Sequence, residues 1–223
     1  LSHNYQTNFQ NIEKKILIDV EEIEKLTTQN KKIIPEIDYA NIKNKSINDE
    51  IIALVKKRGC VVIRNVFEKE KVIEWNYEIE RYIDENNYYE DQKKKAGLDQ
   101  YFSDLQSGKP QIFGLYWSKP QVEARQSENM SIVKSWLNNL WKYEFENKKI
   151  FDPNKELVYA DRIRRRQGGD VSLGLSPHCA AGSIERWIDN AFQKLYEPIF
   201  IDQFESYDPF NSQFRDQTKE ISG

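Results

Sequence analysis

The segment from Ser176 to Ser183 combines a histidine with a preceding proline and a run of small residues. In a facial-triad iron site, two histidines and one carboxylate bind one side of the metal and leave the other side open. A His-x-Asp pair on a strand supplies two of these ligands, because side chains at positions i and i+2 point the same way. Position i here is His178, but position i+2 is Ala180, which has no metal-binding atom. The pattern indicates a metal-binding strand end that has lost its carboxylate.

The sequence contains few other histidine or cysteine side chains that could complete a metal site. The chain has two histidines, and the second, His3, lies beside the N-terminus, where chains are commonly frayed. A single imidazole binds metals weakly and with little selectivity. Cys179 points away from His178 on an extended strand, so a Cys–His nucleophile pair is geometrically poor. The two cysteines, Cys60 and Cys179, have neither the number nor the spacing of a zinc site or a disulfide framework.

Three arginines precede the histidine at alternating positions, namely Arg162, Arg164 and Arg166. On an extended segment they share one face. Because a guanidinium presents a planar fork of donors, they could bind a carboxylate or a phosphate of a cofactor or substrate. The structural alternative is a solvated strand edge. A functional role for one of the three is a hypothesis.

Composition excludes several classes of protein. The chain has 223 residues, is 31% charged and has a net charge of −3, which argues against general nucleic-acid binding. It contains no apolar run of transmembrane length and no secretory signal pattern. We expect a protein without a membrane partner, in a reducing, cytoplasmic setting.

The pattern of elements predicts an N-terminal arm or helix over residues 1–45 and a larger domain over residues 46–223. A helix over 46–58 is predicted from its apolar spacing, with Ser46 as N-cap and Gly59 as its end. The other predicted elements are a strand at Cys60–Phe67, helices at Phe67–Tyr89 and 121–147, a short strand at Gln111–Trp117, and strands at Leu157–Arg164 and Val171–Leu175.

Three separated blocks of sequence carry a family resemblance. Arg58–Phe67 is similar to the helix–strand opening of Fe(II)/2-oxoglutarate oxygenases of the phytanoyl-hydroxylase type. Tyr116–Arg125, and the run from Tyr159 through His178 to Trp187, resemble the YbiU-like family, a domain of unknown function in bacteria and fungi. The resemblance covers roughly residues 46–223.

The resemblance implies an α+β fold with a double-stranded β-helix (jelly-roll) core and N-terminal helices packed outside it. It also implies Fe(II) and 2-oxoglutarate as cofactors and a small molecule as substrate. Only the first metal-ligand position, His178, carries over, because Ala180 stands where the family has Asp. The family also extends beyond this chain's end, so we expect an incomplete core that lacks the distal histidine and the basic partner of 2-oxoglutarate.

Three interpretations of Ala180 follow. The first is a dioxygenase-like protein that is inactive as this chain and can lack a bound cofactor. The second is a halogenase-type variant in a longer chain, in which chloride takes the position of the carboxylate. The third is a non-catalytic small-molecule binding or scaffold protein. An incomplete core would expose sheet edges, so we also expect poor solubility or self-association into a homo-oligomer.

Overall fold

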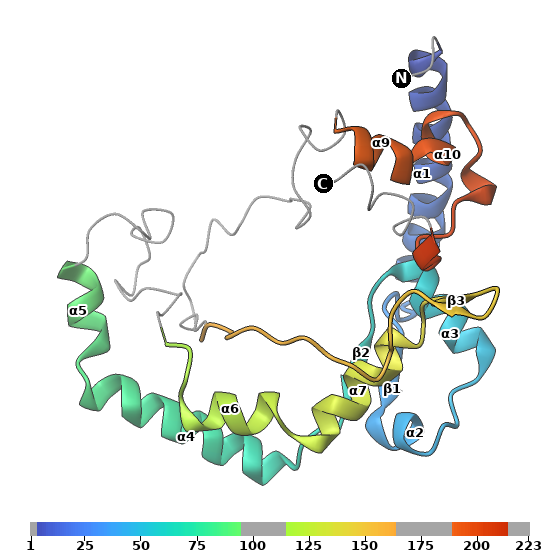
Figure 1. Ribbon diagram of the computed structural model, residues 1–223. Coiled ribbons are helices and arrows are strands. Elements are labelled where there is room, and N and C mark those ends of the chain that lie inside the picture. The colour runs from blue at the N-terminus through green and yellow to red at the C-terminus, as the bar shows by residue number, and fades with distance from the viewer. Residues whose placement is uncertain (1–3, 95–114, 164–188, 214–223) are drawn as a thin grey trace. The chain divides into compact units, whose positions relative to one another are not determined.

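The computed structural model describes residues 4–94, 115–163 and 189–213 (Figure 1). Their helices are α1 (Tyr5–Thr28), α2 (Tyr39–Lys43), α3 (Asp49–Arg58), α4 (Lys69–Glu85), α5 (Tyr88–Lys94), α6 (Lys119–Arg125), α7 (Glu128–Asn138), α9 (Asn190–Leu195), α10 (Glu197–Phe200) and the 3-10 turn η2 (Phe204–Ser206). The strands are β1 (Glu36–Asp38), β2 (Val62–Arg64), β3 (Glu144–Phe145) and β4 (Lys148–Lys149). The described part therefore mixes helices with short strands, and the jelly-roll core stays a prediction.

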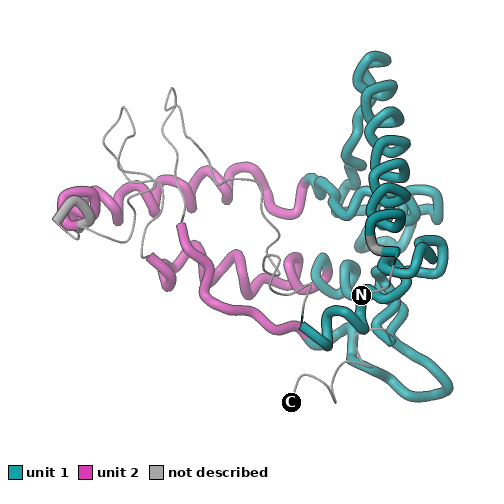
Figure 2. The backbone as a smooth tube through the Cα atoms, turned by 90° about the horizontal axis from the view of Figure 1, so that it is seen from above, with its two compact units in different colours: residues 1–64, 133–155, 179–223 teal, residues 65–132, 156–178 magenta. Residues whose placement is uncertain are grey.

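The chain divides into two compact units, shown in Figure 2. Unit 1 comprises residues 1–64, 133–155 and 179–223, and unit 2 comprises residues 65–132 and 156–178. The boundary falls inside α7, so this helix contributes residues to both units. None of the helices in the described ranges is both long and apolar enough to cross a bilayer.

Unit 1 contains a parallel strand pair. Ile37 of β1 lies opposite Ile63 of β2. Parallel strands need a crossover connection, which α2 and α3 supply here. The Arg64 guanidinium donates to the Glu36 carboxylate at 3.0 Å across the pair. The buried apolar residues of this unit, as far as the chain is described, are Ile37, Tyr39, Ile42, Val55, Val133, Leu140, Ala191, Leu195 and Phe200.

Helix α3 confirms the predicted helix and its end but corrects its start. Gly59 adopts a left-handed conformation with φ 66°, and its N–H donates to Val55, which ends the helix as expected. The N-cap is Asn48, not Ser46, because the Asn48 side chain accepts from the Ile51 N–H at 2.9 Å. Ser46 contacts Asn41 instead, at the end of α2.

The single helix expected over 121–147 is wrong, because two helices and a hairpin occupy this range. Ser127 separates α6 from α7, and its hydroxyl accepts from the Met130 N–H at 3.2 Å in the manner of an N-cap. Glu146 and Asn147 both have positive φ, 47° and 64°, which suits the tight turn between β3 and β4. The strand expected at Cys60–Phe67 is shorter, at Val62–Arg64.

Two further expectations differ in extent. The helix expected at Phe67–Tyr89 is α4, which ends at Glu85, followed by the separate α5. Asn87 lies between them with φ 48°, a value that a continuous helix does not allow. The described part of Leu157–Arg164, residues 157–163, forms no ladder, whereas Val171–Leu175 lies outside the described residues.

Candidate functional site

A capping box starts the short helix α6. The Ser118 hydroxyl accepts from the Gln121 N–H at 3.4 Å, and the Gln121 side-chain oxygen accepts from the Ser118 N–H at 3.2 Å. Pro120 lies in the first turn, where its missing N–H costs nothing. The pattern Ser-x-x-Gln with proline therefore fixes both the start of α6 and the side chain of Gln121.

Gln121 connects three segments of unit 2. Its side chain is buried, at 6% exposure for the residue. The Nε2 group lies 3.2 Å from the Leu115 carbonyl oxygen, 2.8 Å from the Asp161 carbonyl oxygen and 3.3 Å from Asp161 Oδ2. A buried amide is stable only when its hydrogen-bonding groups are satisfied. Gln121 therefore ties the Leu115 segment to the Asp161 segment, 40 residues apart in sequence.

Arg125, at the end of α6, binds the same aspartate. Its guanidinium donates to Asp161 Oδ1, and its side chain is 10% exposed. The guanidinium carbon also lies 5.1 Å from the ring centroid of Trp117, which is within the range of a cation–π contact. Trp117 itself is 70% exposed. The Asp161 carboxylate is thus engaged by two side chains of one helix.

Segments 115–117 and 161–163 contact each other in antiparallel order. The Ile163 N–H donates to the Leu115 carbonyl oxygen at 3.3 Å. Arg162 lies over Tyr116, with its guanidinium carbon 5.4 Å from the ring centroid. Leu115 and Ile163 also belong to one apolar cluster around Ile83, which is 1% exposed. We call Tyr116, Gln121, Arg125, Asp161 and Arg162 the clasp.

Helix α4 supports α6 from its other side. The Trp75 indole N–H donates to the Glu123 carboxylate at 2.8 Å, and the Trp75 ring packs edge-on against Phe67. This hydrogen bond, together with Lys119 and Lys71, holds the pKa of Glu123 below its usual value of 4.5. Lys71 has a raised pKa, chiefly because it donates to Glu74. Ion pairs among Lys71, Glu74, Lys119 and Glu123 therefore connect neighbouring turns of α4 and α6.

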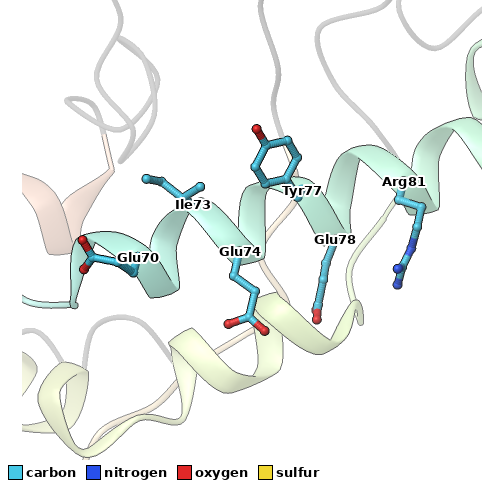
Figure 3. Close-up of a pocket in the computed structure, with 6 residues that line it drawn as sticks. All are labelled: Glu70, Ile73, Glu74, Tyr77, Glu78 and Arg81. Carbon is cyan, nitrogen blue, oxygen red and sulfur yellow. The ribbon is translucent and has the colours of Figure 1, made fainter.

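A shallow hollow of about 620 Å³ runs along α4. Its described lining residues all belong to this helix: Glu70, Ile73, Glu74, Tyr77, Glu78 and Arg81. Figure 3 shows Glu74 and Glu78 extending from one side of α4 and Ile73 and Tyr77 from the other. Glu74 is already paired with Lys71. The described residues contain no group of three His, Cys, Asp or Glu side chains that could hold a metal, here or elsewhere.

Comparison with known proteins identifies the family. The Gig2-like family matches residues 1–222. The chain belongs to the Gig2-like family. Over 217 residues it is 35% identical to the YbiU protein of Escherichia coli K12, and the match covers 97% of this chain and 51% of YbiU. The expected YbiU-like relationship is confirmed, whereas the placement among Fe(II)/2-oxoglutarate oxygenases stays a prediction.

Three solved structures are similar to this chain over nearly its whole length. The JW0805 protein of Escherichia coli, crystallised at high pH, has a TM-score of 0.79 at 32% identity, covering 96% of this chain and 49% of that one. A candidate oxidoreductase from Salmonella typhimurium LT2 has a TM-score of 0.82 at 33% identity, covering 97% and 51%. GIG2 (DUF1479) of Candida albicans, the GlcNAc Inducible Gene 2 product, has a TM-score of 0.74 at 26% identity, covering 98% and 44%.

The Gig2-like chain thus spans about half the length of the relatives it matches. Of the site residues expected from sequence, Arg162 is described and belongs to the clasp. His178, Ala180, Arg164 and Arg166 lie outside the described residues.

Sequence reasoning missed the other members of the clasp, including Gln121 and Asp161. The Ser-x-x-Gln capping pattern at 118–121 was a local signal for the first of these residues. It did not reveal the 40-residue bridge from Gln121 to Asp161, which only the tertiary structure shows.

Proposed function

We propose that this Gig2-like chain is an Fe(II)/2-oxoglutarate oxygenase-like protein with a jelly-roll core, and that it does not catalyse oxidation by itself. Its family membership and the Salmonella relative described as a candidate oxidoreductase support the proposal. The observation that carries it is the clasp. Gln121 and Arg125 join the two blocks that resemble the family, Tyr116–Arg125 and the run that begins at Tyr159.

The metal donors of this chain do not fit a resident iron. A facial triad needs two histidines and one carboxylate. The sequence has only His3 and His178, and Ala180 offers no donor atom at the position of the expected aspartate. The residues of this chain therefore support no reaction step through iron or 2-oxoglutarate. The functional interpretation is a pocket for a small molecule next to a metal position that has lost its ligand set.

A halogenase-type variant is the second candidate, and the small side chain of Ala180 favours it. An alanine at the carboxylate position leaves a coordination position that an anion such as chloride can take. A non-catalytic binding or scaffold protein is the third candidate. These candidates differ in two measurable properties, which are whether the protein holds metal and whether it turns over 2-oxoglutarate.

The experiment compares the wild-type chain with Ala180→Asp and His178→Ala. Each purified protein is analysed for bound iron, zinc and nickel by mass spectrometry. Each is then incubated with Fe(II) and 2-oxoglutarate, with and without chloride, and succinate formation is measured. We expect the wild type to contain no stoichiometric metal and to form no succinate. Ala180→Asp should bind Fe(II) more tightly than the wild type, because it restores a second ligand on the same strand face.

The outcomes separate the three candidates. Chloride-dependent succinate formation by the wild type would establish the halogenase variant. Succinate formation without chloride would overturn the proposal that the chain is inactive. If Ala180→Asp binds Fe(II) no better than His178→Ala, position 178 is not a metal position and the binding or scaffold function stands.

A further inference from the structure

Arg162 is a cation that packs on an aromatic ring and that no described carboxylate pairs with. Its side chain is exposed, and its guanidinium carbon lies 5.4 Å from the centroid of the Tyr116 ring. The carboxylate next to it in sequence, Asp161, is engaged by Arg125 and Gln121. Arg162 has no ion-pair partner in the part of the chain that the structure describes.

The backbone that carries Arg162 is fixed on both sides. Gln121 donates to the carbonyl oxygen of Asp161 at 2.8 Å, immediately before Arg162. The Ile163 N–H donates to Leu115 at 3.3 Å, immediately after it. An arginine on a fixed backbone and against an aromatic ring loses less conformational entropy on binding than a free surface arginine. This geometry favours binding of a ligand by the Arg162 guanidinium over a purely solvated side chain.

Among the residues that the structure describes, the charges near Arg162 suit a ligand with a single negative charge. Arg125 is balanced by Asp161, and Lys71 and Lys119 are both close to Glu123. One guanidinium fork matches the geometry and charge of one planar carboxylate. A phosphate carries more charge and would favour a cluster of cations.

We propose that Arg162, seated on Tyr116, binds the carboxylate of a small organic molecule, and that Gln121 is the positioning residue for it. The inference goes beyond the proposed function, because this site needs neither metal nor 2-oxoglutarate. Asp161 has a structural role in this site. Its carboxylate binds Arg125 and Gln121 of α6, so it does not pair with the neighbouring Arg162.

The binding test uses the wild-type chain in EDTA, so that metal plays no part. The probes are acetate, succinate and benzoate, each compared with its uncharged methyl ester, and inorganic phosphate. Binding is followed by NMR titration. We expect at least one carboxylate to bind and its ester to bind at least tenfold more weakly. Arg162→Ala should weaken the carboxylate by about tenfold or more, as expected for loss of a charged hydrogen-bond donor. Arg162→Lys should restore part of the affinity, because it keeps the charge but not the fork.

Matched variants separate recognition from folding. Arg81→Ala removes an equally charged, exposed arginine from α4 in the same unit and should leave the affinity unchanged. Gln121→Ala should lower the affinity several-fold, because it frees the backbone before Arg162. Ser118→Ala removes the α6 cap and one hydrogen bond to the Gln121 side-chain oxygen, but it leaves the Gln121 donor to Asp161 in the chain, so it should have the smaller effect on affinity.

Four results would overturn the proposal: no binding by any carboxylate, equal binding by the esters, tighter binding by phosphate, or equal losses in Arg162→Ala and Arg81→Ala. If Ser118→Ala and Gln121→Ala weaken binding equally, Gln121 acts only through helix stability and is not a positioning residue. None of these results depends on iron, so failure here is distinct from failure of the oxygenase-like proposal.

Discussion

The two units differ in the contacts found inside each of them. Among the described residues, unit 1 contains nine buried apolar residues, whereas unit 2 contains two, Ile83 and Leu115. Both units also bury polar side chains, Asn8 and Ser212 in unit 1 and Gln121 in unit 2, and Gln121 contacts both segments of its discontinuous unit. The described part of unit 1 therefore has the larger apolar core, whereas in the described part of unit 2 a buried, hydrogen-bonded amide connects the two segments.

This difference bears on function. Apolar contacts are non-directional and tolerate small shifts, whereas a hydrogen-bonded amide fixes positions to within a few tenths of an ångström. The site residues expected from sequence follow Asp161 directly, and Arg162 is the first of them. A directional contact thus fixes the backbone next to Arg162, the side chain that we propose to bind a carboxylate.

The largest effect on stability is expected in the apolar core of unit 1. Ile37→Ala removes a side chain that is 5% exposed in the centre of β1. It should lower the free energy of unfolding by ~2–5 kcal/mol, because a cavity is left in the core. Urea denaturation measures the loss, and amide hydrogen exchange assigns it to unit 1. Ile34→Ala, at a position 44% exposed, is the matched control and should cost less than about 0.5 kcal/mol. Equal losses would mean that β1 does not belong to an apolar core.

A smaller loss of stability is expected when the buried Gln121 of unit 2 is replaced. Gln121→Leu keeps the approximate volume of the side chain but removes its donors, leaving carbonyl oxygens of Leu115 and Asp161 without this partner. We expect a loss of ~1–3 kcal/mol in the free energy of unfolding. Faster amide exchange should be confined to residues 115–117 and 161–163. Gln126→Leu, the same change at the exposed end of α6, should be nearly neutral. A neutral Gln121→Leu would show that apolar contacts alone hold unit 2.

Local features of the fold were predictable from sequence, and the distant contacts were not. Gly59 ends α3 as expected, because glycine adopts positive φ at little cost. The break at Ser127 and the turn at Glu146 were missed, because the apolar residues from Val122 to Trp141 were assigned to one helix that was extended to residue 147. The alternation of Tyr143 and Phe145 with polar residues was a local signal for a strand before that turn.

The candidate site shows the same limit more strongly. Arg162 could be chosen by its residue type and its alternation with Arg164 and Arg166. Its significance depends on Asp161 being occupied by Arg125, which is 36 residues away. No local pattern encodes that pairing, since it arises only when two segments are brought together by tertiary folding.

The hydrogen bond between α4 and α6 provides a test through titration. Trp75→Phe removes the donor to Glu123 and retains an aromatic ring against Phe67. The pKa of Glu123, which this bond lowers, should rise towards 4.5, and carbon NMR of the carboxylate can follow it. A carboxyl group with a lowered pKa stabilises the fold above pH 4.5 and loses that effect as the pH falls. Tyr77→Phe, on the exposed side of α4, should leave the Glu123 titration unchanged. An unchanged pKa in Trp75→Phe would mean that the lysines alone set it.

The smallest effect is expected at the surface ion pairs of unit 1. Arg64 and Lys32 both donate to Glu36 and lower its pKa from 4.5 to about 2. Because the folded-state pKa is the lower one, the stabilisation is complete above pH 4.5 and is lost as the pH falls towards 2. Glu36→Gln should therefore reduce the pH dependence of unfolding in that window, with little change in the dependence at neutral pH. Urea denaturation between pH 2 and pH 7 measures it, and Glu24→Gln, at an exposed position of α1, is the control. If the free energy of unfolding falls equally with pH in the wild type and in Glu36→Gln, the Arg64–Glu36 pair does not stabilise the contact between β1 and β2. The stability of unit 1 would then not depend on these surface ion pairs, and its contrast with unit 2 would be sharper.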